Sequence, residues 1–120
     1  MFRSLLWVGL GGAAGSMLRY FLQQALNGLR FPWGTLAVNI AGCLLIGILW
    51  GLVARGQLQA PGRALLMSGF CGGFTTLSAF SYESNLLLQE GRSGPFFLYA
   101  AATVLGGLLA TFVGYKAIHS

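Results

Sequence analysis

A segment with three glycines and several hydroxyl side chains interrupts the third apolar stretch of the sequence, and its centre runs from Gly69 to Thr76. Each glycine lowers helix stability by about 1 kcal/mol relative to alanine, and Ser and Thr can satisfy backbone groups that a broken helix frees. Carbonyl oxygens released from a helix are good ligands for a hard alkali cation. The segment predicts a broken helix that holds an ion, or else a packing kink that binds nothing.

Asn39 is a polar side chain inside the second apolar stretch, with Thr35 four residues earlier on the same helical face. Its amide offers two N–H donors and one acceptor, and it is costly in hydrocarbon without a partner. Two interpretations remain open: the side chain lines a path for an anion, or it bridges two helices. Phenylalanine rings leave a similar choice, because their positive edges can face an anion but periodicity does not select that role.

The composition requires lipid around these residues. Of the 120 residues, 56% are hydrophobic and 8% are charged, and a soluble domain of this size could not hide so much apolar surface. A membrane-spanning helix needs about 20 mainly apolar residues. We therefore expect one all-α domain over residues 1–120, with four transmembrane helices and the third broken at mid-membrane: about Leu5 to Leu26, Trp33 to Ala54, Arg63 to Leu88 and Phe96 to Ile118.

Small residues recur inside these spans, as in Gly11 to Gly15 and at Gly42, Gly47 and Gly51. In lipid, where little hydrophobic drive holds helices together, small side chains allow the backbones to approach closely. We therefore expect most of these glycines to serve helix packing.

The seven basic residues are scattered singly, which indicates helix ends near lipid headgroups and not a nucleic-acid surface. Four flank the side of both termini and two the opposite side, with a seventh near its edge: Arg3, Arg55, Arg63, Lys116; Arg30, Arg92; Arg19. So weak a bias allows insertion in both orientations. Two opposed copies could then pair about an axis in the membrane plane, as inverted repeats do within one chain.

Three motifs stand in order along the chain: Gly11-Gly12-Ala13-Ala14-Gly15-Ser16 with Arg19-Tyr20, Gly34-Thr35-Leu36-Ala37-Val38-Asn39 with Gly42, and Gly69-Phe70-Cys71-Gly72-Gly73-Phe74-Thr75-Thr76-Leu77-Ser78-Ala79-Phe80 with Glu83. Together they resemble the Fluc/CrcB family of bacterial fluoride channels across essentially the whole chain. The resemblance implies an antiparallel, dual-topology homodimer in the cell inner membrane, with two pores that export fluoride passively. It also implies a structural Na+ at the dimer centre, on the backbone carbonyls of Gly72 and Thr75.

The resemblance further implies a fluoride path with Asn39 as a hydrogen-bond donor and Phe80 as a ring whose edge meets the anion. Polar lining and pore-mouth residues follow in the same way: Thr76, Ser78, Tyr99 and Thr103 for the lining, Arg19 and Glu83 for the mouths. Two positions depart from the family's pattern, since Leu77 stands where a second Phe is usual and Gly107 where a Ser is usual.

Rival functions need groups that the sequence barely supplies. A small four-helix multidrug exporter, the main alternative, exchanges protons and substrate on a membrane-embedded carboxylate, and the chain has only Glu83 and Glu90. A membrane enzyme such as a lipid kinase needs Mg2+ ligands and phosphate-binding groups, so we do not expect an enzyme. A purely structural subunit would leave Asn39 and the hydroxyl cluster without a role.

Overall fold

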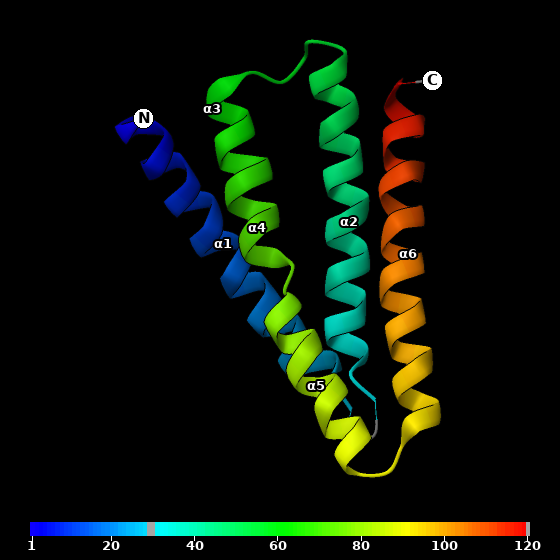
Figure 1. Ribbon diagram of the computed structural model, residues 1–120. Coiled ribbons are helices and arrows are strands. Elements are labelled where there is room, and N and C mark those ends of the chain that lie inside the picture. The colour runs from blue at the N-terminus through cyan, green and yellow to red at the C-terminus, as the bar shows by residue number, and fades with distance from the viewer. Residues whose placement is uncertain (29–30, 120) are drawn as a thin grey trace.

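The computed structural model describes residues 1–28 and 31–119, and it is helical almost throughout. Four helices are long and apolar enough to cross a membrane: α1 (Phe2–Leu26), α2 (Trp33–Ala54), the composite third span (Ala60–Gln89) and α6 (Ser93–His119). They overlap the four predicted spans and make the chain a multi-pass membrane protein. Both chain ends and the α2–α3 connection lie at one end of the molecule (Figure 1).

The third span is divided into four pieces. A short helix α3 (Ala60–Gly62) leads into a π-helical segment η1 (Arg63–Cys71), then α4 (Gly72–Phe74) and, after an interruption, α5 (Leu77–Gln89). The interruption covers only Thr75 and Thr76, whose backbone is extended (φ −82°, ψ 157° and φ −152°, ψ 118°). The predicted broken helix is therefore present, but the break is narrower than expected and follows the glycines.

Glycines of α1 and Gly73 of the third span allow close packing between these helices. A side chain at Gly11 would overlap the Leu65 carbonyl, and one at Gly15 would overlap the Phe70 carbonyl. On the opposing segment, a Cβ at Gly73 would lie 2.5 Å from the Gly12 carbonyl oxygen. Helix α1 thus crosses η1 and α4 at backbone contact, as small residues allow in lipid.

The second close pair is α2 with α6, which lie side by side along most of their length (Figure 1). Side chains at Gly47 and Gly114 would overlap the backbone carbonyls of Thr111 and Leu44. At the end that carries both termini, Arg55 Nη1 donates to the Ile118 carbonyl at 2.9 Å. Arg92 belongs to the opposite end, and Arg30 lies outside the described residues.

We expect Gly15→Ala to lower the free energy of unfolding by about 2 kcal/mol, because the atoms it meets are backbone atoms that cannot move aside. Thermal unfolding in detergent measures this. Gly9→Ala is the matched control, since a Cβ there meets nothing within 4 Å and alanine favours the helix by up to about 1 kcal/mol. Equal stability of the two variants would contradict the packing role of Gly15.

Candidate functional site

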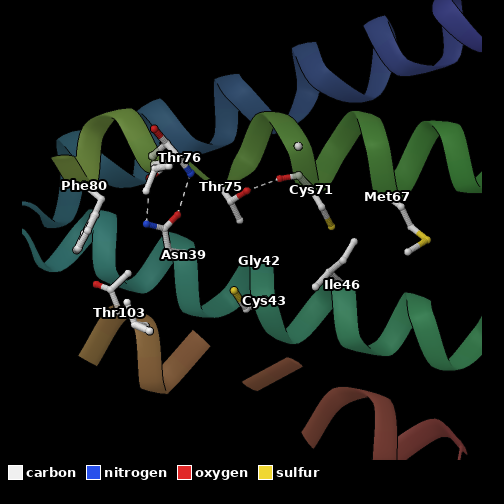
Figure 2. A pocket seen from close by; sticks show the side chains of 13 residues that line it. Asn39, Gly42, Cys43, Ile46, Met67, Cys71, Thr75, Thr76, Phe80 and Thr103 are labelled. Carbon is white, nitrogen blue, oxygen red and sulfur yellow. Dashed lines mark hydrogen bonds between the residues drawn. The ribbon is translucent and has the colours of Figure 1, made fainter. Parts of the chain in front are cut away.

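A cavity of about 440 Å³ lies beside the interruption of the third span, and we call it the break cavity (Figure 2). Its walls come from α2, from the third span on both sides of the interruption, and from α6. The lining residues are Asn39, Gly42, Cys43, Ile46, Met67, Cys71, Gly72, Thr75, Thr76, Leu77, Phe80, Thr103 and Val104. The cavity therefore gathers six of the residues predicted for the ion sites, together with Leu77: Asn39, Gly72, Thr75, Thr76, Phe80 and Thr103.

Asn39 holds the interruption open. Its Oδ1 accepts from the Thr76 backbone N–H at 2.8 Å and its Nδ2 donates to the Thr76 carbonyl at 3.2 Å (Figure 2). The side chain is buried, with 8% of its surface exposed. Among the described residues Nδ2 has this one acceptor, so a second N–H remains. Asn39 thus bridges two helices and also keeps a donor at the cavity wall.

Hydroxyl groups complete the two edges of the interruption. Thr75 Oγ1 donates to the Cys71 carbonyl at 2.9 Å, and Thr76 Oγ1 accepts from the Ala79 backbone N–H at 3.1 Å as the N-cap of α5. Helix α5 consequently begins at the cavity, and its N-terminus brings partial positive charge there. Ser78 pairs with Thr76 Oγ1 at 3.2 Å, but Ser78 is exposed and does not line the cavity.

Phe80 and Thr103 face the cavity from α5 and α6 (Figure 2). The Thr103 hydroxyl oxygen is buried and has no hydrogen-bond partner within residues 1–28 and 31–119. Tyr99 lies one turn before Thr103, is fully buried, and has its ring 5.0 Å from the Phe80 ring between centroids. Tyr99 does not line the break cavity, so its contact with Phe80 is its connection to it.

The two departures from the family's pattern lie in different surroundings. Leu77 lines the break cavity and is 77% exposed, so most of its side chain is uncovered in a single chain. Gly107 is buried, and a Cβ there would lie 3.2 Å from Cys43 Sγ. A larger residue at Gly107 would therefore crowd the α2–α6 contact.

Glu83 is the centre of a hydrogen-bond network that joins four helices. Its Oε2 accepts from Asn27 Nδ2 and from Thr35 Oγ1, and its Oε1 accepts from the Tyr99 hydroxyl, each at 3.0 Å. Asn27 also accepts from the Thr35 backbone N–H at 3.0 Å. A second cavity, of about 180 Å³, is lined by Glu83 together with Glu90 and Arg92. The Glu83 carboxylate therefore lies between this second cavity and the Tyr99 ring that contacts Phe80.

Arg19 lies beside the third span rather than among the residues around Glu83. Its Nε donates to the Gly73 carbonyl at 3.1 Å, and its Nη1 donates to Gln23 Oε1 at 3.0 Å. Sequence reasoning singled out neither Gln23 nor Asn27. A usable signal existed for Gln23, because an amide within an apolar span is costly and usually has a function or a partner.

The carbonyl groups predicted for Na+ fit a shared site in part. Gly72 and Thr75 both line the break cavity, and no side chain among the described residues donates to either carbonyl. Gly72 is exposed, and a Cβ there would meet nothing within 4 Å. Hard oxygen atoms suit an alkali cation, but one chain offers few of them, so a second copy would have to supply the rest.

Comparison with known proteins identifies the family. The family model described as CrcB-like protein, Camphor Resistance (CrcB), matches residues 6–115. A Phocaeicola vulgatus protein named fluoride-specific ion channel FluC is 45% identical over 115 residues, which cover 93% of this chain and 95% of the relative. A protein of the same name from Thermus thermophilus is 47% identical, over 92% of this chain and 90% of its own length. Another from Rhizobium etli is also 47% identical, over 95% of this chain and 94% of its own length. The chain belongs to the CrcB family.

Proposed function

We propose that the protein is a fluoride-selective channel through which F− leaves the cell down its gradient, across the inner membrane. The observation that carries this proposal is the set of donors at the break cavity. Asn39 keeps an N–H, the Thr103 hydroxyl has no partner within the described chain, and helix α5 begins there. The relatives named fluoride-specific ion channel FluC support fluoride as the anion.

The chemistry of fluoride explains why such donors are needed. The ion is small and strongly hydrated, so a narrow path must replace its water with protein donors. The Asn39 N–H, the Thr103 hydroxyl and the positive edge of the Phe80 ring supply them, with Thr76 and Tyr99 as neighbouring polar groups. Chloride is larger and more weakly hydrated, so it fits the path poorly and gains less from these donors.

We propose that the channel is an antiparallel homodimer with two pores and one structural Na+ between the subunits. The carbonyls of Gly72 and Thr75 support this proposal, because among the described residues no side chain donates to them and hard oxygen atoms suit an alkali cation. The exposed Leu77 beside them presents apolar surface that a second copy would cover. When bound, the cation would contribute fixed positive charge in a region of low dielectric, where it attracts an anion strongly.

The multidrug exporter gains no support from this geometry. A proton-coupled exporter needs a membrane carboxylate that is free to exchange a proton for substrate. Glu83 instead receives three hydrogen bonds from side chains of α1–α2 and α6. The Glu83 carboxylate is therefore held in place by these bonds, which favours a structural role over proton exchange.

Reconstituted protein is expected to pass fluoride down its gradient and to pass chloride at least about a hundredfold more slowly, a difference of roughly 2.7 kcal/mol in barrier. Liposomes loaded with each salt, read with a fluoride or a chloride electrode, measure both rates. Protein-free liposomes are the control. Comparable rates for the two anions, or no fluoride flux, would overturn the proposal.

The same liposomes test the cation. We expect replacement of Na+ by N-methyl-D-glucamine on both sides to reduce fluoride flux or the fraction of dimer on size exclusion, because the shared carbonyls lose their ligand. If fluoride flux and the fraction of dimer recover when Na+ is added back, removal of the ion caused the loss and the protein was not damaged. Flux and dimer fraction that do not respond to Na+ would remove the structural cation from the proposal.

A further inference from the structure

A continuous chain of hydrogen bonds runs from Arg19 on α1 to Glu83 on α5 through two other side chains. Arg19 Nη1 donates to Gln23 Oε1 at 3.0 Å, Gln23 Nε2 donates to Thr35 Oγ1 at 3.0 Å, and Thr35 Oγ1 donates to Glu83 Oε2 at 3.0 Å. Gln23 and Thr35 are buried, with 8% and 0% of their surface exposed. Gln23 is therefore the only residue of α1 that contacts both Arg19 and the Glu83 network in this chain of bonds.

The direction of every bond in this chain is fixed by the two ends. A guanidinium group can only donate, so Gln23 must present its Oε1 to Arg19 and its Nε2 to Thr35. The Thr35 oxygen then accepts from Gln23, and its one hydrogen goes to Glu83. The Thr35 hydroxyl is thus oriented by Glu83, which accepts its hydrogen, while its oxygen accepts from Gln23 Nε2 at 3.0 Å and, more weakly, from Asn27 Nδ2 at 3.5 Å.

We infer that Gln23 is a positioning residue of the pore, which acts on Glu83 through Thr35. This inference rests on the proposed channel function. Glu83 Oε1 accepts a hydrogen bond from the Tyr99 hydroxyl, and the Tyr99 ring in turn contacts the Phe80 ring. Loss of the Gln23 donor leaves the Thr35 oxygen with only the longer contact from Asn27 Nδ2, at 3.5 Å. Thr35 and Glu83 are then held less firmly, which disturbs the position of Phe80.

The other end of the chain reaches the break. Arg19 Nε donates to the Gly73 carbonyl at 3.1 Å, next to Gly72. Gln23 accepts from another nitrogen of the same guanidinium, so one amide joins the segment before the break to the carboxylate after it. Hydrogen bonds in such a network strengthen one another. The Gln23 amide therefore affects both the Gly73 end and the Glu83 end of the chain.

The alternative is that Gln23 is only a hydrogen-bonded polar residue between α1 and α2, with no effect on the pore. A double-mutant cycle separates the two roles, because residues acting in one chain give non-additive effects. We expect Gln23→Met and Thr35→Val each to reduce fluoride flux by about tenfold. The double variant should be no slower than either single one, whereas independent effects would multiply.

Gln24→Met is the matched control, since it makes the same change at an exposed neighbour and is expected to keep normal fluoride flux. If the unchanged protein and this control pass no fluoride, the proposed function fails. If both pass fluoride and Gln23→Met does too, only the role of Gln23 fails. Multiplied effects in the cycle would likewise assign Gln23 a structural role and overturn the inference.

Gln23→Glu covers the case in which Gln23→Met does not give a monodisperse protein. The new carboxylate keeps the Arg19 contact but cannot donate to Thr35. We expect a protein that runs normally on size exclusion and whose fluoride flux is still reduced about tenfold, while Gln24→Glu is unaffected. Normal flux in Gln23→Glu, or failure of both Gln23 variants to assemble, would overturn the inference.

Discussion

Replacing Asn39 with alanine is expected to reduce fluoride flux by about a hundredfold, equivalent to roughly 2.7 kcal/mol. The variant loses the second N–H of Asn39, a residue that lines the break cavity, and it also loses both hydrogen bonds to the Thr76 backbone. A buried backbone group left without a partner is costly in itself. Fluoride efflux from liposomes measures the loss, and size exclusion reports assembly.

Two further variants separate these contributions. Asn39→Asp keeps an acceptor for the Thr76 N–H, but an ionised carboxylate has no hydrogen-bond donor. This variant should therefore assemble and still conduct poorly. Asn85→Ala is the control, because Asn85 is exposed on α5 and, among the described residues, its side chain bonds only to the Ser81 carbonyl of its own helix. Asn39→Ala with the flux of Asn85→Ala would remove Asn39 from the pore.

Phe80→Ile is expected to reduce fluoride flux by about thirtyfold, equivalent to roughly 2 kcal/mol. Isoleucine keeps much of the volume and the apolar contact with Tyr99, but it has no positive ring edge. The effect should therefore fall on conduction and leave thermal stability and assembly nearly unchanged. Fluoride efflux and thermal unfolding of the same preparation distinguish the two.

Phe97→Ile is the matched control. It makes the same change at a residue of α6 that does not line the break cavity and is 67% exposed. Its fluoride flux should equal that of the unchanged protein. Phe80→Ile with unchanged flux would show that the ring edge at this position contributes nothing to conduction. A loss of assembly in step with flux would instead assign Phe80 to packing.

The long helices could be predicted from composition because span length and lipid thickness decide them locally. The four apolar stretches overlap the four long helices, and the third is interrupted as expected. The glycines of α1 pack against the third span, which the frequency of small residues also indicated. Each of these features depends on neighbours in the sequence or on the solvent.

The position of the break could not be read from the glycines, although glycine weakens a helix. Gly72 and Gly73 stay helical, and the chain leaves the helix at Thr75 and Thr76. The reason is tertiary, because the Asn39 amide replaces the helical partners of Thr76 from another helix. Propensity predicted a break in the segment, and a contact between helices decided which residues form it.

The sequence by itself therefore determined the membrane, the number of long helices, the interrupted third span and the residue types that could meet an ion. Only the tertiary structure decided which polar groups are already paired and which remain free for a ligand. Thr35 and Glu83, which bond directly, are 48 residues apart. Gln23 reaches Thr35 because α1 packs closely against α2 at Gly34, where a Cβ would lie 2.9 Å from the Gln23 Cα. In lipid, a buried polar group must find a partner wherever packing brings one.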